Sequence, residues 1–270
     1  NYGGWAFQYR AKDDMARFEN LSANAAGVVV LPSSTLEWRN EKGKHTTRYE
    51  GDIRVDDLAH AMQKFGFASS IEGKGLKLKA NVAWEGSPAM VDVNRVVGSV
   101  EIHEGEGRFV QAETGGALKL LGIFDFASLT RRARLDFSDV VNKGFEFSDI
   151  SGVTAFNEGS VGVTEPIVIE GTSGRFTVGG SVDLESGTLD NELIVTLPVS
   201  RTLPWYAAYS AIATGPLAGA GVMIAQKVFE NQINQMSSAK YKITGTIDEP
   251  NIEFVAIFDD KVAEAQPEKP

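Results

Sequence analysis

Alternation of apolar and polar side chains is the sequence feature that most constrains this chain. In residues 174–184 the apolar side chains, among them Phe176 and Val178, share one parity, and most polar side chains take the other. Residues 76–84 and 240–247 show the same period of two. Because successive side chains of a β-strand point to opposite faces, this pattern predicts strands with one apolar and one polar face.

Further segments with this pattern are separated by turn signals. The sequences EGSP, NEGS, GTSG, ESGT and DEPN contain the Gly, Asn, Asp and Pro residues that hairpin turns favour. We expect strands at residues 96–102, 145–154, 160–169, 188–197 and 252–258. Alternation in nearly every strand favours one antiparallel sheet of about ten strands, since buried parallel strands have continuous apolar runs.

Helical signals are few, so the fold class we expect is mainly β with a few helices. Residues 55–66 read VDDLAHAMQKFG, with Asp56 or Asp57 near the start and Gly66 as a C-cap. Residues 115–133 read as one broken or two short apolar helices. A third helical region begins near residue 202.

Three short helical stretches are too few to cover the apolar face of such a sheet. Two arrangements follow from the pattern. Either the sheet folds onto itself as a sandwich, or part of its apolar face lines an open groove for an apolar ligand. The alternation alone leaves both open.

The segment Thr202–Gln226 is the longest stretch without a charged residue. Gly215-Pro216 divides it, so neither half reaches the length of about 20 residues that a bilayer span requires. We expect two short helices that either pack into the core or lie at a membrane interface. The candidates for membrane contact in this segment are Trp205, Tyr206, Tyr209, Leu217 and Val222.

Composition and motifs exclude several classes of function. A formal charge of −10 and a pI near 4.9 argue against nucleic acid as a partner. The chain has no Cys, which excludes disulfides, thiolate nucleophiles and Cys-ligated metals. None of the common nucleophile, zinc-protease or nucleotide-binding motifs is present. We therefore expect neither an enzyme nor a cofactor.

The histidines do not indicate a metal site. His45, His60 and His103 share no ligand spacing, although His103 lies in EIHEGEGR among three glutamates. A solvated strand end at a turn is the favoured interpretation of that stretch, and we predict no metal.

One basic cluster comes just after the apolar stretch at residues 116–129. It contains Arg131, Arg132 and Arg134. These guanidinium groups either stabilise the end of a helix or contact phospholipid headgroups at the edge of an apolar surface.

The two ends of the chain suggest a piece of a longer protein. The sequence starts without Met, and NYGGWAF has no signal-peptide pattern. We expect a single domain over residues 1–258, with an apolar helical insert at about residues 203–237, and a disordered tail at residues 259–270.

Residues 121–152, LGIFDFASLTRRARLDFSDVVNKGFEFSDISG, closely resemble the C-terminal region of the YhdP family of AsmA-like proteins. Other stretches match that family in order: EGDIRVDDLAHAMQKFGF, LKLKANVAWEGSP, GRFTVGGSVDL, VTLPVS, the GPLAGAG segment and YKITGTIDEPNIE. The resemblance covers roughly residues 46–258.

This resemblance implies a fold and a function. Members are similar to TamB and to bridge-like lipid transfer proteins, which carry a long curved β-groove with an apolar lining, a β-taco. They are anchored in the inner membrane of Gram-negative bacteria, cross the periplasm and are implicated in moving phospholipid between the two membranes. The region matched here would lie at the outer-membrane end, facing the inner leaflet.

The resemblance favours the groove over the sandwich and gives phospholipid as the expected ligand. The candidate groove residues are Leu76, Leu78, Val82, Trp84, Val100, Ile102, Val161, Val163, Phe176, Val178, Val182, Leu193 and Val195. Two alternatives remain: a docking or assembly module for an outer-membrane protein or lipoprotein, and a lipid-free β-sandwich that caps a longer groove.

Overall fold

The structure is a computed structural model that describes residues 3–64, 69, 71–110, 145–172, 174–197, 237–257 and 262. Within them, fourteen strands form one sheet, together with one α-helix and one 3₁₀ helix. The insert at 203–237, the basic cluster at 131–134 and the tail at 259–270 lie wholly or almost wholly outside the described residues.

Most strands are long. Their bounds are β1 Gly4–Lys12, β2 Met15–Ala25, β3 Val28–Glu41, β4 Lys44–Val55, β5 Ile71–Gly73, β6 Leu76–Glu85, β7 Val96–Glu104, β8 Gly107–Phe109, β9 Phe145–Asn157, β10 Ser160–Gly171, β11 Gly174–Asp183, β12 Leu189–Leu197, β13 Ser237–Gly245 and β14 Pro250–Ile257. The helices are α1, Leu58–Lys64, and the 3₁₀ turn η1, Val93–Arg95.

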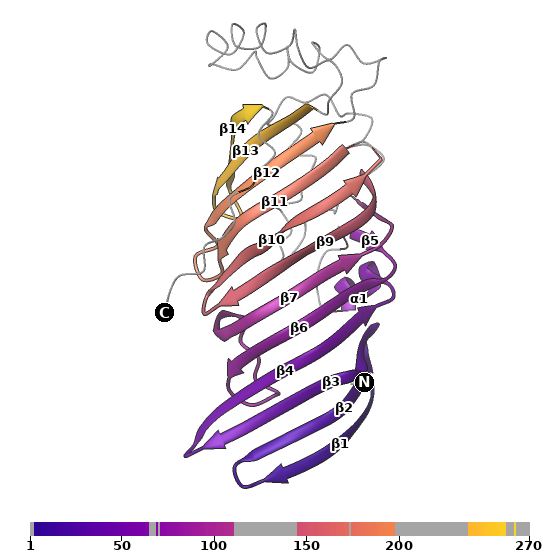
Figure 1. Ribbon diagram of the computed structural model, residues 1–270, viewed down its shortest axis with the longest axis vertical. Helices are drawn as coiled ribbons and strands as arrows, with labels where there is room; N and C mark the ends of the chain where they lie inside the picture. The colour runs from indigo at the N-terminus through magenta and orange to yellow at the C-terminus, as the bar shows by residue number, and fades with distance from the viewer. Residues whose placement is uncertain are drawn as a thin grey trace, which may run out of the picture.

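Every strand pairs antiparallel with its neighbours, and the order is almost that of the chain. The path runs β1-β2-β3-β4-β6-β7-β9-β10-β11-β12-β13-β14, with the short strands β5 and β8 to one side. Figure 1 shows the resulting elongated, twisted and curved sheet, with β1 and β14 at opposite ends. The predicted fold, a large curved antiparallel sheet that forms an open apolar groove, is confirmed.

The sheet is larger than the ten or so strands expected from the sequence, chiefly because residues 4–55 form four strands that were not predicted. Bulges interrupt their pairing between Ala6 and Gln8, and between Phe18 and Leu21. A bulge adds a residue to one strand and reverses the parity beyond it, so the period of two cannot be followed through β2 and β3.

The strands cross the groove from side to side, so their ends form two rims. The first, which we call the hairpin rim, carries the turns at residues 13–14, 42–43 and 158–159. In the last of these, Glu158 and Gly159 both have positive φ, 22° and 88°. A two-residue hairpin requires this backbone geometry, and Gly at the second position adopts it without steric cost.

The opposite rim carries α1, and we call it the α1 rim (Figure 1). The predicted N-cap is confirmed: the Asp57 carboxylate accepts a hydrogen bond from the His60 backbone N–H at 2.9 Å. The strand ends Phe109 and Phe145 are partners, as are Leu197 and Ser237. Both long connections therefore leave the sheet and return to it at the α1 rim.

Near the α1 rim, β5 and β8 pair with each other, and β8 also pairs with β9. Gly73 lies opposite Gly107, and Gly107 opposite Phe147. Because β8 follows β7 after only Gly105 and Glu106, the two strands together cross the groove along β9.

Candidate functional site

The strand register brings all the candidate groove residues to one surface, which we call the apolar face. Cross-strand partners in a sheet point to the same side, and so do residues two apart along a strand. Leu78 lies opposite Ile102, and Phe176 opposite Val195. The face comprises Leu76, Leu78, Val82, Trp84, Val100, Ile102, Val161, Val163, Phe176, Val178, Val182, Leu193 and Val195.

These residues fall into two groups by exposure. Six are buried, and five of them lie on β10 to β12: Val163, Phe176, Val178, Leu193 and Val195, with Trp84 on β6 as the sixth. Seven are half-buried: Leu76, Leu78, Val82, Val100, Ile102, Val161 and Val182. The apolar face is therefore more accessible along β6 and β7 than along β11 and β12.

Two hydrophobic clusters correspond to this division. The larger contains Ile169, Leu189 and Ile243, which are 0 to 2% exposed. The smaller is built around Leu21 and Tyr49, and most of the side chains packed against it are only half-buried. The part of the face from β2 to β7 is thus the more open end of the groove.

At the N-terminal edge of the sheet the apolar face is exposed. Trp5, Phe7 and Tyr9 on β1 are 48 to 57% exposed, and the rings of Phe7 and Tyr9 pack on Phe18 with centroids 5.2 and 5.4 Å apart. Sequence reasoning missed this aromatic row. The signal was present, since aromatic residues occupy alternate positions in WAFQY.

Several polar side chains in the apolar region are satisfied locally. Ser34 Oγ and Tyr49 OH lie 3.0 Å apart, and both residues are buried. Burial raises the pKa of Tyr49, and the hydrogen bond to Ser34 opposes this effect. Thr47 donates a hydrogen bond to the Gly86 carbonyl at 2.8 Å. The hydroxyl groups of Ser34, Tyr49 and Thr47 therefore have partners within the protein and do not indicate a ligand site.

Glu104, at the end of β7, differs from these satisfied groups. It is 2% exposed, and neither carboxylate oxygen has a hydrogen-bond partner among the described residues. Burial raises the pKa of its carboxyl group to about 6. In the sequence, the surrounding stretch EIHEGEGR was considered as a metal site, and a solvated strand end was favoured instead. The pattern did not predict that Glu104 would be buried in the apolar face.

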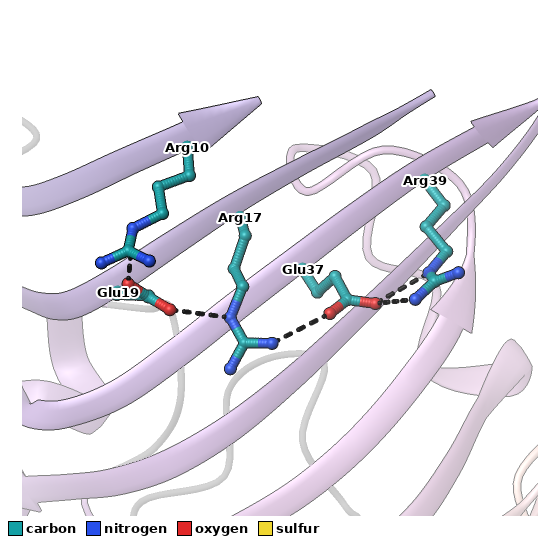
Figure 2. A network of polar contacts seen from close by, with 5 residues as sticks. All are labelled: Arg10, Arg17, Glu19, Glu37 and Arg39. Atoms are coloured by element: carbon teal, nitrogen blue, oxygen red, sulfur yellow. Dashed lines mark hydrogen bonds and ion pairs between the residues drawn. The ribbon is translucent and has the colours of Figure 1, made fainter. Parts of the chain in front are cut away.

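The opposite surface of the sheet, the polar face, is charged. Figure 2 shows a chain of ion pairs across β1, β2 and β3. Arg10 and Arg17 each lie 3.2 Å from Glu19, Arg17 lies 3.4 Å from Glu37, and Glu37 lies 2.7 Å from Arg39. One apolar and one charged face is the arrangement expected of a sheet that holds an apolar ligand on one side and meets water on the other.

The histidines do not converge on a metal. His103 points to the polar face, where its Nδ1 lies 3.4 Å from Asp149 Oδ1, while its neighbour Glu104 points to the apolar face. Within the described part of the chain, no group of three or more His, Asp or Glu side chains is placed to hold a metal ion.

The predicted membrane-contact residues lie outside the described residues: Arg131, Arg132, Arg134, Trp205, Tyr206, Tyr209, Leu217 and Val222. Both connections that contain them start and end at the α1 rim. Among the residues that the structure describes, no helix has the length and apolar character needed to cross a bilayer.

Known proteins of similar sequence show the family of this chain. One relative, "Intermembrane phospholipid transporter YhdP" of Escherichia coli (strain K12), is 29% identical over 219 residues, which are 81% of this chain and 17% of the relative. The chain thus spans less than a fifth of the length of that relative. No solved structure gives a significant match. The profile of the family described as "YhdP protein" matches residues 1–252. The chain therefore belongs to the YhdP protein family.

Proposed function

We propose that this chain binds phospholipid without covalent chemistry, with acyl chains against the apolar face and headgroups at the rims. The observation that carries this proposal is the apolar face itself. It continues across every strand of the main path, opposes a charged face, and is half-buried rather than closed along β6 and β7.

The energetics favour such a surface. Removing one CH₂ group from water contributes about 0.8 kcal/mol, so even partial burial of an acyl chain offsets much of the cost of taking a lipid from a bilayer. Half-buried side chains such as Leu78 and Val100 have apolar area left to contribute. No general base or nucleophile is required for this function.

The family relationship suggests where this binding operates. The relative from Escherichia coli is named an intermembrane phospholipid transporter. We propose that this chain is part of a periplasmic protein that transfers phospholipid between the inner and outer membranes, and that it forms the end facing the outer-membrane inner leaflet. The resemblance of residues 121–152 to the C-terminal region of the family supports this position.

Photocrosslinking tests the lipid-binding proposal directly. A photoreactive amino acid at Leu78 or Val100 on the apolar face should crosslink to phospholipid in cells, with the product identified by mass spectrometry. The same probe at Lys79 or Glu101, on the polar face of the same strands, is the matched control. Protein without bound lipid, or crosslinks of equal yield from both faces, would contradict the proposal.

A lipid-free cap is the second candidate for one part of the sheet. The near-complete burial of Ile169, Leu189 and Ile243 favours a closed core there rather than a groove. Probes at Val178 and Leu193 distinguish the two. Lipid crosslinks at both would extend the groove to this end, whereas crosslinks at Leu78 alone would limit lipid to the open part. Crosslinks to one outer-membrane protein or lipoprotein would instead favour a docking module.

The candidates for membrane contact are tested separately. A charged residue in place of Trp205 or Val222 should weaken association with vesicles while the protein remains folded, if this segment lies at a membrane interface. Replacing Arg131 and Arg132 with Gln should reduce binding to anionic vesicles in particular. Unfolding of the Trp205 and Val222 variants would favour core packing.

A further inference from the structure

We propose that Glu104 receives the ammonium group of an amine-bearing phospholipid, such as phosphatidylethanolamine, at the α1-rim end of the apolar face. This inference rests on the proposed lipid binding and adds a headgroup preference to it.

The first support is the environment of the carboxylate. Glu104 is buried, its cross-strand partner is Ile150, and neither of its oxygens has a partner among the described residues. The backbone N–H of Gly105 is close enough to favour the charged form slightly but does not reach hydrogen-bond geometry. A buried carboxylate without a partner is costly, so such a group in a binding surface indicates a missing ligand.

The second support is that no cation among the described residues lies beside Glu104. On β5, β6, β8 and β9, the titratable groups around Glu104 belong to the polar face by register: Glu72, Lys77, Arg108, Glu146 and Asp149, with His103 on β7 itself. Several are paired there, as Arg108 is with Glu72 at 2.6 Å. Among the ionisable residues of strands β5 to β9, Glu104 is the one whose side chain lies on the apolar face.

The third support is the close approach of β5 to this side chain. A Cβ atom on Gly73 would lie 2.8 Å from the Glu104 carboxyl carbon. The carboxylate therefore packs flat against the backbone of β5, at a place where only glycine leaves room for it. Pairing with β8 holds β5 in this place.

Its place in the groove suits a headgroup. Strands cross the groove, so the end of β7 lies towards a rim, where a lipid headgroup would meet water. Ile102, two residues earlier on the same face, and its partner Leu78 are half-buried. Acyl chains lying on these two side chains would bring the headgroup to Glu104.

An ammonium group fits better than a metal ion. Ca²⁺ takes about six to eight oxygen ligands, and Mg²⁺ requires near-octahedral coordination. The described residues place no further acidic side chain beside Glu104 on the apolar face. One ammonium group can be held by a single carboxylate and by water, and its charged hydrogen bond to the carboxylate is the stronger kind.

The test compares lipids that co-purify with the protein. Wild type, Glu104→Gln and the control Glu101→Gln, on the polar face of the same strand, are purified from cells, and their bound lipids are quantified by mass spectrometry. In Glu104→Gln the ratio of phosphatidylethanolamine to phosphatidylglycerol should fall about tenfold, the effect of losing one charge-assisted interaction. Total bound lipid should stay nearly constant, and Glu101→Gln should match wild type.

The outcomes separate this inference from the function on which it rests. An unchanged lipid ratio in Glu104→Gln, with lipid still bound, would overturn the headgroup assignment alone. Absence of lipid from wild type would overturn the proposed function and this inference with it.

Two further measurements use wild-type protein, so they do not depend on folding of the variant. Wild type loaded from an equal mixture of the two lipids at about pH 7.5 and about pH 5 should lose its preference at the lower pH, where the carboxyl group is protonated. Delipidated wild type should not gain thermal stability from MgCl₂ or CaCl₂. A Glu104-dependent gain would assign the site to an inorganic cation and overturn the proposal.

Discussion

A Cβ atom on Gly73 would lie 2.8 Å from the carboxyl carbon of Glu104 and 2.9 and 3.0 Å from its two oxygens. The two residues are 31 positions apart in the sequence, on β5 and β7, strands that do not pair with each other. The absence of a side chain at residue 73 is thus what leaves room for a buried carboxylate in the apolar face.

Gly73→Ala should destabilise the protein through this contact. The added methyl group must displace either the Glu104 carboxylate or the β5 backbone, and overpacking of this kind costs about 1–3 kcal/mol. When Gly73→Ala is combined with Glu104→Ala, most of that cost should disappear, because the carboxylate atoms that the new methyl group would meet are no longer present. The measurement is chemical denaturation of both single variants and the double variant.

The control for this cycle is Gly105→Ala, one residue after Glu104. A Cβ atom there has no heavy atom within 4 Å apart from its chain neighbours. Its free energy of unfolding should lie close to that of wild type. Equal losses for Gly73→Ala with and without Glu104 would show that the strain arises elsewhere in β5.

Protonation of Glu104 should make the delipidated protein more stable at mildly acidic pH. Burial raises the pKa of this carboxyl group from 4.5 to about 6, so the folded state binds more protons than the unfolded state between these values. The stability that Glu104 contributes is therefore present below the unfolded pKa and falls as the pH rises through about 6. At neutral pH the charged form destabilises the fold by about 2 kcal/mol, at ~1.4 kcal/mol per pKa unit.

Glu104→Gln removes this titration while nearly keeping the shape of the side chain. The difference in unfolding free energy between variant and wild type should grow in favour of the variant from about pH 4.5 to pH 7. This difference cancels the contributions of other groups that titrate in both proteins. One is Asp183, whose pKa is lowered by hydrogen bonds from Ser186 and whose effect on stability has the opposite pH dependence. A difference independent of pH would mean that Glu104 titrates normally.

The fold followed from the sequence where the alternation was unbroken. Phe176 and Val178 share a parity, and so do Leu76 and Leu78, and the register brings all the candidates to one face. The bulged strands β2 and β3 were missed, because a period of two cannot be followed through an inserted residue. In β1 and β4 the alternation is present, and those two strands could have been predicted.

Features that depend on contacts between distant residues could not be predicted from the sequence. Alternation cannot tell the half-buried Leu78 from the buried Val178, since exposure depends on what faces each strand in space. Glu104 stands in a run of glutamates that looks solvated. Its carboxylate lies against Gly73 of β5, a contact between residues far apart in the sequence. Three-residue strands of this kind carry too few positions for a periodic signal.

The buried hydrogen bond between Ser34 and Tyr49 should couple the two residues energetically. Their oxygens lie 3.0 Å apart on adjacent strands, and Ser34 has no exposed surface. Ser34→Ala or Tyr49→Phe alone leaves one hydroxyl with a lost partner and should cost about 1–2 kcal/mol. The double variant should cost less than the sum, and a double-mutant cycle measures the coupling. Strict additivity would contradict a hydrogen bond that contributes to stability.

The ion pairs on the polar face should contribute little. Glu37 contacts both Arg17 and Arg39, but the arginine side chains are 43 and 48% exposed and compete with water for the carboxylate. Such pairs are screened by salt and contribute about 0–1 kcal/mol each. Glu37→Gln should therefore lower the unfolding free energy by less than about 1 kcal/mol at low salt. The loss should shrink further at about 1 M NaCl, where charges are screened within about 3 Å. A larger loss that persisted in salt would mean that the chain of charges in Figure 2 acts as a cooperative network and holds the edge strands β1 to β3 in register.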